Sequence, residues 1–327
     1  DVIVPKICWA IFFLNFVSAN ETATAPLMLD RILVVTLSNI GDAVMTTPVF
    51  ETLHKLYPNS VIDIIGDERS SEIFQGAPYL GVTYHRRKKA SLWENMWLVG
   101  RLRQQKYDLI VDLRTNLIPI LLRGKRRLYK RSRSGVFQHS VEEHMSAILS
   151  LLNKEFKTPL CKVYIDKEEA RKARTVVSTI PQGRWLAMAP GANWPGKKWA
   201  ASRYRELIFK LDGEFDAVLL LGIEGDSLGD IETSITPIFD FTGKTNLSLV
   251  KVLLSQSSFF IGNDSGLGHL AASLSVPTLT LFGPGNPDRY KPLSMTSSVL
   301  VAPENNLGKL TPDFVFEAML PHLKKGR

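Results

Sequence analysis

Three glycine-containing segments of this sequence carry side chains that could bind an anion or move a proton. Residues 38–42 read Ser-Asn-Ile-Gly-Asp, residues 189–199 include Lys197 and Lys198, and residues 262–272 read Gly-Asn-Asp-Ser-Gly-Leu-Gly-His-Leu-Ala-Ala. Glycine allows a backbone to approach a ligand closely, and helix-start amides together with a lysine ammonium group can face phosphate oxygens. The three segments therefore favour a phosphate-binding protein with a proton-transfer group nearby.

Asp42 in the first segment has two interpretations. An aspartate at the start of a helix often serves as its N-cap, which typically contributes about 1 kcal/mol to stability. A carboxylate at the mouth of a cleft can instead act as a general base and take the proton from an attacking hydroxyl. Residues 38–42 alone leave both interpretations open.

The second segment reads Ala-Pro-Gly-Ala-Asn-Trp-Pro-Gly-Lys-Lys-Trp and suits an anion site. It lacks the glycine and lysine spacing of a Walker loop, and no Ser or Thr follows Lys198 as a magnesium ligand. A solvated basic loop packed over tryptophans is the alternative.

The third segment is the most specific, because a further glycine-rich stretch, Phe-Gly-Pro-Gly-Asn-Pro, follows at residues 282–287. Asp264 or Ser265 could merely cap a helix, and His269 could be an ordinary core residue. Glycine-rich loops at successive strand ends are nevertheless hard to attribute to packing alone. Amides at the helix start would hold a diphosphate and stabilise it as it leaves.

Strands must place these segments, and the chain alternates β-branched runs with amphipathic stretches, which is the pattern of doubly wound parallel sheets. The first half has strand candidates at residues 32–37, 61–66, 82–85, 109–113 and, more weakly, 127–130. The second half has them at residues 185–189, 217–221, 238–241, 259–261 and 278–282. Each glycine-rich segment follows a strand. It therefore lies at the carboxyl ends of the strands, where such sheets bind ligands.

The pattern predicts an α/β protein of two domains joined near residues 153–162. We expect residues 28–160 to form the first domain and residues 161–327 the second, since 327 residues exceed the usual size of a single core. Residues 1–27 are expected to be an extension outside the fold. Their apolar residues 7–14 are too short to span a bilayer, although they also resemble part of an export signal.

Composition limits the class of partner and the compartment. A net charge of +8 points to phosphates, acidic glycans, nucleic acid or an anionic membrane surface. Cys8 and Cys161 lie far apart without metal-ligand spacing, which argues against a disulfide framework or a zinc site and favours a reducing, cytoplasmic environment.

The segments at residues 38–42, 190–199 and 263–269, with Phe-Gly-Pro at 282–284, resemble those of the bacterial ADP-heptose:lipopolysaccharide heptosyltransferases of glycosyltransferase family nine. The resemblance runs from about residue 28 to residue 321. It implies the GT-B architecture of two Rossmann-like domains, the first binding the acceptor and the second the nucleotide sugar. In such folds the last helix often packs back on the first domain, and residues 312–323 could do so.

Site residues carried over from this resemblance are Asp42 as the catalytic base, Lys197 as the phosphate-binding lysine, and a donor-site motif. That motif consists of Asp264, Ser265, Gly266 and His269. The family also uses an acidic residue near the nucleoside ribose, for which Glu224 and Asp226 are both available. The resemblance implies transfer of a heptose from ADP-heptose to the inner core of lipopolysaccharide.

The residues themselves favour a metal-independent reaction with no cofactor. No Asp-x-Asp pair occurs in the sequence, so a lysine and helix-start amides must neutralise the leaving diphosphate. A diphosphate leaves without protonation, and a single base therefore suffices for an inverting, in-line displacement. The carboxylate pair of a retaining glycosidase is unnecessary.

Two basic runs of the first domain, residues 86–89 and 123–133, suggest where an anionic lipopolysaccharide precursor would bind. A basic run is often only a solvated face. Near an anionic lipid surface, however, each Lys or Arg can contribute about 1 kcal/mol. We expect peripheral contact with the cytoplasmic face of the inner membrane and acceptor contacts from Arg123, Lys125, Arg126 and Arg127.

Other function classes fit less well. A basic nucleic-acid-binding protein would use the second run, but nothing in the sequence resembles a recognition helix or an RNP motif, and no nucleic-acid partner is expected. A dinucleotide oxidoreductase would need the Gly-x-Gly-x-x-Gly fingerprint that residues 37–42 lack. A nearer alternative keeps the fold and transfers another nucleotide-activated sugar to a capsule or core glycan.

Overall fold

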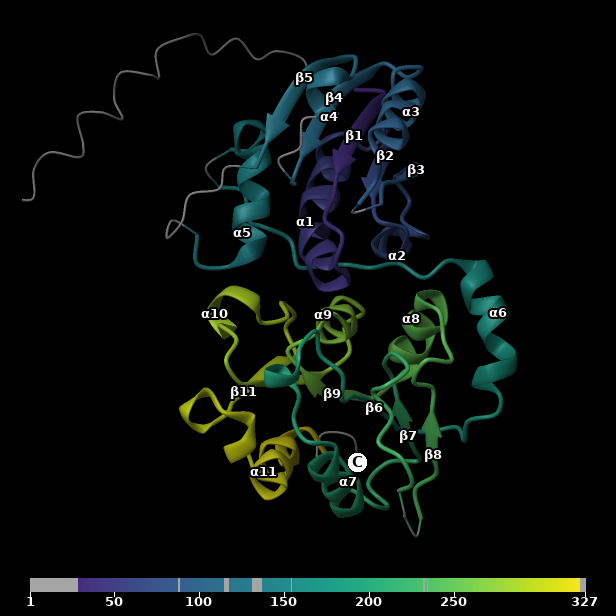
Figure 1. Ribbon diagram of the computed structural model, residues 1–327, viewed down its shortest axis with the longest axis vertical. Coiled ribbons are helices and arrows are strands. Elements are labelled where there is room, and N and C mark those ends of the chain that lie inside the picture. The colour runs from purple at the N-terminus through teal and green to yellow at the C-terminus, as the bar shows by residue number, and fades with distance from the viewer. Residues whose placement is uncertain are drawn as a thin grey trace, which may run out of the picture.

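The computed structural model describes residues 29–323 apart from residues 88, 115–117, 131–136, 154, 232 and 234. The expected extension at residues 1–27 therefore lies outside the described part. Two stacked bodies, each built on a parallel sheet, make up the described chain (Figure 1). This confirms the predicted α/β class with two doubly wound domains.

The first domain contains a five-stranded sheet in the order β3-β2-β1-β4-β5. Every neighbouring pair is parallel, and helices connect successive strands. The strands and helices, in chain order, are β1 (Arg31–Val35), α1 (Ile40–Leu56), β2 (Val61–Gly66), α2 (Glu68–Ser71), the 3₁₀ helix η1 (Glu72–Phe74), β3 (Leu80–His85), α3 (Leu92–Leu102), β4 (Tyr107–Asp112), α4 (Ile118–Leu121), β5 (Gly124–Tyr129), α5 (Ser140–Met145) and η2 (Ser146–Leu151).

The second domain contains a six-stranded parallel sheet in the order β11-β10-β9-β6-β7-β8. Its edge strand β11 was not predicted, because serines begin it and its side chains are only partly buried. The elements are α6 (Lys167–Val177), β6 (Trp185–Ala189), η3 (Pro195–Lys197), α7 (Ala201–Lys210), β7 (Ala217–Leu220), β8 (Ile238–Asp240), α8 (Leu247–Gln256), β9 (Phe259–Asn263), α9 (Gly266–Ser273), β10 (Thr278–Phe282), α10 (Pro287–Tyr290), β11 (Ser297–Val301), η4 (Pro303–Asn305), η5 (Leu307–Lys309) and α11 (Pro312–Leu323).

Both sheets reverse their strand order once, between β1 and β4 in the first and between β6 and β9 in the second. Loops on either side of such a reversal diverge and leave a crevice beyond the carboxyl ends of the strands. The segments that follow β1, β6 and β9 are the three glycine-containing segments of the sequence. The topology therefore places all three at ligand-binding edges.

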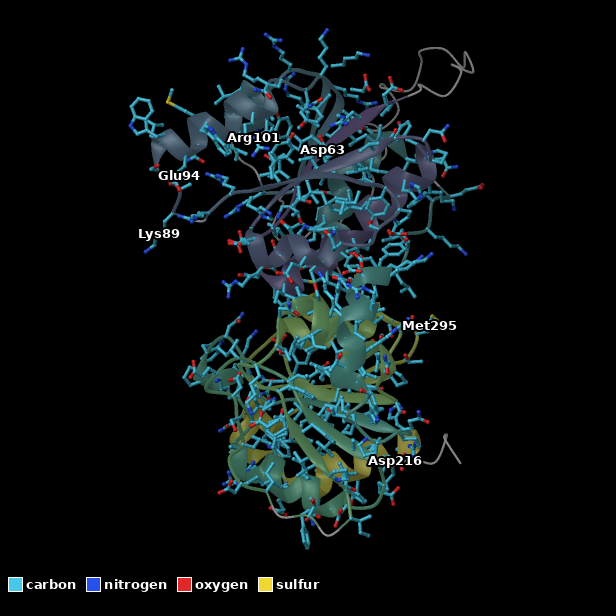
Figure 2. All side chains as sticks on the ribbon, turned by 90° about the vertical axis from the view of Figure 1, so that its right-hand side faces the viewer. Asp63, Lys89, Glu94, Arg101, Asp216 and Met295 are labelled. Carbon is cyan, nitrogen blue, oxygen red and sulfur yellow. The ribbon has the colours of Figure 1, made fainter. Side chains whose placement is uncertain are left out.

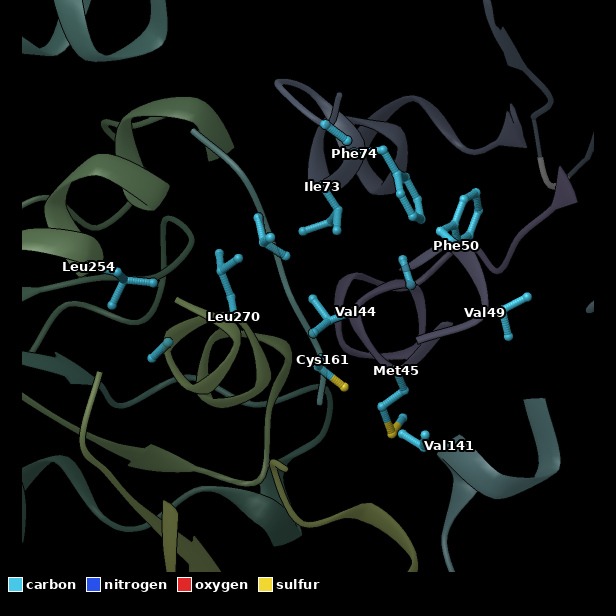
Figure 3. Close-up of a cluster of buried hydrophobic side chains, with 14 of the residues drawn as sticks. Val44, Met45, Val49, Phe50, Ile73, Phe74, Val141, Cys161, Leu254 and Leu270 are labelled. Atoms are coloured by element: carbon cyan, nitrogen blue, oxygen red, sulfur yellow. The ribbon is translucent and has the colours of Figure 1, made fainter. Parts of the chain in front are cut away.

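Helices α1 and α9 pack against each other and join the two domains (Figure 3). Val44 and Leu270 from these helices belong to one buried hydrophobic cluster that contains residues of both domains. The chain passes from one domain to the other beside them, where the Lys162 amide donates to Thr47 Oγ1 at 3.0 Å. The seam between the domains is thus a packed apolar contact around α1 and α9.

Pro48 inside α1 is accommodated locally. Proline has no N–H to donate to the carbonyl four residues earlier, which belongs to Val44. The Thr47 hydroxyl donates to that carbonyl at 2.7 Å. The Thr-Thr-Pro sequence therefore lies within a continuous helix that spans Ile40–Leu56.

The expectation that the last helix packs back on the first domain is wrong for the described residues. Helix α11 packs on α7 of the second domain (Figure 1). Its Val315 and Met319 join Trp199 and Tyr204 in one buried cluster. The chain reaches α11 from β11, an edge strand of the second sheet, so the nearest apolar surface is that of its own domain.

Within the described residues, no helix combines the length and apolar character needed to cross a bilayer.

Candidate functional site

Asn263 holds the end of β9 and the loop after β6 together. Its side chain is fully buried. Its amide Nδ2 donates to the Pro190 carbonyl at 2.6 Å, while its Oδ1 accepts from the Trp199 amide and the Tyr204 hydroxyl, both at 3.1 Å. Sequence reasoning included Asn263 in a motif without a role. Its role is to position the loop of residues 190–199 relative to β9.

Lys197 and Asp264 form the charged centre of this site. Lys197 Nζ lies 2.5 Å from Asp264 Oδ2, and the aspartate is largely buried while the lysine is partly exposed. A Cβ added to Gly285 would lie 2.6 Å from that same carboxylate oxygen. The glycine-rich loop after β10 therefore closes over Asp264, and three of the predicted segments meet at one ion pair.

The neighbouring Lys198 makes a separate pair with Asp226 at 2.8 Å. Asp226 also accepts from the Ile223 amide at 3.1 Å, and a Cβ on Gly191 would come within 2.1 Å of its Oδ2. Asp226 thus organises the loop after β7. Glu224 lies exposed in the same loop, so of the two acidic candidates it is the one whose carboxylate faces solvent.

The start of α9 provides an anion-binding geometry. Ser265 occupies the N-cap in an extended conformation, and its hydroxyl makes no capping bond. Its Oγ is buried without a hydrogen-bond partner. The first amides of a helix have no intrahelical acceptor and carry the positive end of the helix dipole. Gly266, the first residue of α9, contributes one of these amides.

The start of α1 lies directly against the start of α9. A Cβ on Gly41 would lie 3.2 Å from Gly266 Cα and 3.1 Å from His269 Cδ2, so a side chain here would crowd both residues. Asn39 is the N-cap of α1, and Asp42 is the third helical residue. The interpretation of Asp42 as an N-cap is therefore wrong. Asp42 Oδ2 instead accepts from Asn39 Nδ2 at 2.8 Å.

His269 is buried at this seam. Burial, with smaller contributions from His139 and Lys197, lowers the pKa of His269 from 6.5 to about 4. The imidazole is therefore neutral near pH 7 and can act as a hydrogen-bonding group but not as a cation.

The predicted acceptor residues Arg123, Lys125, Arg126 and Arg127 lie along β5, whose first residue pairs with the first residue of β4. Lys125 forms an ion pair with Asp108 at the start of β4, and Arg127 donates to the carbonyls of Pro119 and Leu122. Arg126 donates to Ser150. The glycine-containing segments follow strand ends, whereas Arg123 and Lys125 lie where β5 starts. The structure therefore does not bring these residues to the donor-site residues.

Other basic residues occupy the carboxyl ends of the first sheet. Arg86 follows β3, Arg114 follows β4 and Lys130 follows β5. Burial and the nearby Arg114 lower the pKa of the Arg86 guanidinium. The sequence signal for Arg114, which was missed, is its position directly after the strand predicted at residues 109–113. Lys88 and residues 131–133 of the predicted basic runs lie outside the described residues.

A bridge on this side also links the domains. Glu143 on α5 pairs with Lys130 at 3.1 Å and with Arg289 of α10. His139 Nε2 lies 3.0 Å from the Lys291 carbonyl. The same seam therefore contains charged contacts beside the apolar core. In the part of the chain that is described, no cluster of three or more His, Cys, Asp or Glu side chains could hold a metal ion.

Comparisons with known proteins identify a matching family and related proteins. The model of glycosyltransferase family 9 (heptosyltransferase) matches residues 96–316. Lipopolysaccharide heptosyltransferase 3 of Escherichia coli strain K12 is 25% identical over 273 residues, which cover 74% of this chain and 79% of that protein.

Two solved structures share the fold. A family 9 glycosyl transferase from Veillonella parvula superposes with a TM-score of 0.82 at 21% identity, covering 92% of this chain and 100% of that one. The ADP-heptose lipopolysaccharide heptosyltransferase II of E. coli superposes with a TM-score of 0.78 at 23% identity, covering 90% and 99%.

Proposed function

The chain belongs to glycosyltransferase family 9, and from this premise we propose that it transfers a heptose from ADP-heptose to the inner core of a lipid A-linked lipopolysaccharide precursor. The second domain would bind the donor and the first domain the acceptor. The E. coli relative is a lipopolysaccharide heptosyltransferase, and one structural neighbour is an E. coli ADP-heptose lipopolysaccharide heptosyltransferase. We place the enzyme at the cytoplasmic face of the inner membrane as a peripheral protein.

One observation carries this proposal: the start of α1, with Asp42, lies against the start of α9, with its anion-binding amides. The Gly41 amide nitrogen is 3.0 Å from where a Cβ on Gly266 would be. A base from one domain and a leaving-group site from the other are thereby adjacent. Transfer from a nucleotide sugar to a hydroxyl requires this juxtaposition, because nucleophile and leaving group flank the same anomeric carbon.

In the proposed reaction, Asp42 takes the proton from the acceptor hydroxyl while the oxygen of that hydroxyl forms a bond to the anomeric carbon. The bond from that carbon to the β-phosphate oxygen breaks on the opposite face, so the configuration inverts. The ADP anion that leaves would be stabilised by Lys197, by the Ser265 hydroxyl and by the amides from Gly266 onward. Lys197 would exchange some of its contact with Asp264 for a phosphate oxygen, and Glu224 is proposed to bind the ribose.

For the acceptor, we propose that its phosphates and carboxylates bind at the carboxyl edge of the first sheet. Arg86 follows β3 and Arg114 follows β4, and their charges lie close enough for that of Arg114 to affect Arg86. Arginine matches carboxylate and phosphate geometry through paired N–H donors. This assignment replaces Arg123, Lys125, Arg126 and Arg127.

The experiment that tests the function is a thermal-shift series with ADP-, UDP- and GDP-sugars, followed by a transfer assay on lipopolysaccharide precursors. A donor at 100 times its dissociation constant should stabilise the fold by about 2.7 kcal/mol. We expect ADP-heptose to give the largest shift and transfer to persist in excess EDTA. A larger shift and faster transfer with another nucleotide sugar would instead assign the alternative of a capsule or core glycan transferase.

A further inference from the structure

Helix α3 presents large apolar side chains to solvent. Leu92, Trp93, Met96 and Trp97 are 74%, 77%, 54% and 65% exposed. The surfaces of soluble proteins commonly expose single apolar residues, but four apolar residues on adjoining turns of one helix form a contiguous patch. We call these four residues the α3 patch.

The patch is separate from the face by which α3 packs on its own domain. At about 100° per residue, its four positions fall within an arc of about 140°. Leu98 and Leu102, the buried residues of the helix, lie on the opposite side. A capping box fixes the helix start, since Ser91 accepts from the Glu94 amide and Glu94 accepts from the Ser91 amide. The exposure therefore belongs to a well-formed helix whose core contacts are already satisfied.

Basic side chains border the patch. Arg87 and Lys89 precede the helix and are exposed, and the Arg101 guanidinium lies 5.0 Å from the centre of the Trp97 ring. Glu94, an acidic neighbour, pairs with Arg87 at 3.7 Å. Figure 2 shows Lys89, Glu94 and Arg101 projecting from one edge of the first domain, with Lys89 the nearest of the three to the second domain.

A hollow of about 580 Å³ adjoins the patch, and Trp97 lines it. Its lining also includes Arg69, Arg86 and Arg87, together with Asp67 and Glu68. Asp67 directly follows β2 and Arg86 directly follows β3, so the hollow opens at the carboxyl edge of the first sheet. An apolar helix face and a hollow lined by both arginines and carboxylates thus lie side by side at the edge where acceptor binding is proposed.

We propose that the α3 patch docks the protein on an anionic phospholipid bilayer, with Trp93 and Met96 entering the headgroup region. Tryptophan favours this region because its ring is apolar and its N–H is polar, and lysine and arginine are attracted to anionic headgroups. A purely apolar partner surface would not explain the basic border. In this orientation the hollow opens beside the bilayer, where a lipid-linked anionic acceptor would enter. The docking assigns a surface to the peripheral membrane contact proposed above, and the entry of the acceptor rests on the proposed function.

Vesicle co-sedimentation of the full chain tests the proposal, with phosphatidylcholine vesicles that contain or lack phosphatidylglycerol. Wild-type protein should bind the anionic vesicles, and Trp93→Ser/Met96→Ser should lower the apparent partition coefficient at least about tenfold. Phe209→Ser is the matched control, because Phe209 is an exposed apolar residue on α7 of the second domain. It should bind like wild type. Arg87→Glu/Lys89→Glu should reduce binding to anionic vesicles only.

A second measurement does not depend on loss of binding. Vesicles with brominated acyl chains should quench the tryptophan emission of the wild-type protein. Trp93→Phe/Trp97→Phe should still bind and lose most of that quenching. A melting curve confirms that each variant is folded.

Three results would overturn the proposal. Unchanged vesicle binding by Trp93→Ser/Met96→Ser would show that another segment, such as apolar residues 7–14, carries the attachment. Equal binding to neutral vesicles would remove the role of the basic border. A wild-type dimer in light scattering that Trp93→Ser converts to monomer, with no vesicle binding, would assign the patch to a second copy of the chain. Nucleotide-sugar thermal shifts are measured without vesicles, so failure of the proposed function would be seen independently.

Discussion

Asp42 is the residue whose chemistry depends most on its neighbours. Its carboxylate accepts from Asn39, the N-cap residue of α1, and lies one residue after the glycine that touches His269. A carboxylate in the first turn of a helix is stabilised by the helix dipole by about 0.3–1 kcal/mol. That is a small structural contribution, and a catalytic contribution would be several times larger. The two are therefore separable by mutation.

We predict that Asp42→Asn lowers turnover by about 10²–10⁴-fold while donor affinity stays nearly unchanged, because asparagine keeps the size and cannot accept the proton. The measurement is the transfer rate at saturating donor and acceptor, with a melting curve to confirm folding. Asp108→Asn is the control, since Asp108 lies at the start of β4 and pairs with Lys125. Near-wild-type turnover of Asp42→Asn would remove this residue from the mechanism.

Lys197 and Lys198 offer a matched pair at the donor site. Each pairs with one largely buried aspartate, Asp264 or Asp226. Alanine at either position leaves that aspartate without its cation, so we expect similar losses of stability from both variants. Lys197→Ala alone should cost on the order of 2–4 kcal/mol in transition-state stabilisation, because only Lys197 faces the proposed diphosphate site. Isothermal titration with ADP and steady-state kinetics check this. Equal losses of ADP affinity and transfer rate in both variants would contradict this prediction.

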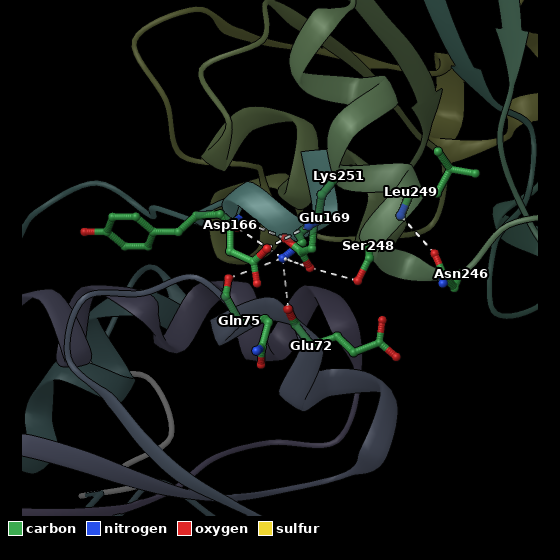
Figure 4. Close-up of polar contacts among 9 residues, drawn as sticks. Glu72, Gln75, Asp166, Glu169, Asn246, Ser248, Leu249 and Lys251 are labelled. Atoms are coloured by element: carbon green, nitrogen blue, oxygen red, sulfur yellow. Dashed lines mark hydrogen bonds and ion pairs between the residues drawn. The ribbon is translucent and has the colours of Figure 1, made fainter. Parts of the chain in front are cut away.

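Helix α8 contributes a buried charged contact between the domains (Figure 4). Lys251 is fully buried, and its Nζ lies 2.7 Å from Glu169 Oε1. It also donates to the carbonyls of Glu72 and Gln75 in the first domain at 3.2 and 3.4 Å, and to that of Tyr164 at 3.1 Å. One ammonium group therefore satisfies carbonyls from both sides of the seam.

Removing this ammonium group should be costly. We predict that Lys251→Met destabilises the protein by about 3–5 kcal/mol, because it leaves the Glu169 carboxylate buried without a cation. Lys251→Met/Glu169→Gln should recover part of that loss, which a double-mutant cycle in denaturant unfolding measures. Lys172→Met is the control: its pair with Glu168 lies on the same helix α6 but is exposed, so stability should hardly change. Additive losses in the cycle would argue against coupling.

At the scale of the whole molecule, buried histidines make stability depend on pH. Burial lowers the pKa of His144 from 6.5 to about 3, with a further lowering from Lys130, and the pKa of His269 is about 4. These residues lie on α5 of the first domain and α9 of the second. Both helices border the seam between the domains, so protonation there affects the molecule as a unit.

The direction of this pH dependence follows from proton binding by the folded and the unfolded chain. Between pH 6.5 and about 4 the unfolded chain binds protons at these histidines and the folded chain does not, so stability falls as the pH is lowered. Each histidine should contribute up to about 1.4 kcal/mol per pH unit. Melting curves from pH 7 to pH 4.5 test this. His144→Gln should flatten the dependence, whereas replacement of the exposed His85 by Gln should leave it unchanged. An unchanged slope in His144→Gln would contradict the assignment.

Much of the fold was predictable from sequence, because local pattern determines it. Continuous apolar runs such as β6 and β7 are typical of buried central strands, and glycine suits close backbone approaches, as at Gly41 and Gly266. The order of the glycine-containing segments along the chain also placed them at strand ends. The family resemblance and the α/β class rested on these local features, and the comparisons and structure confirm both.

The tertiary structure alone decided which charges meet and which edge they occupy. Lys197 pairs with Asp264 across 67 residues of sequence, and Lys251 lies near Glu72 across 179. The sequence predicted an acceptor site at the basic residues of β5. Arg123 and Lys125, however, lie where that strand begins, at the opposite edge of the sheet from the ends of its strands. Sequence pattern reports burial and local conformation, whereas partner choice depends on distances between segments that only the packed chain brings together.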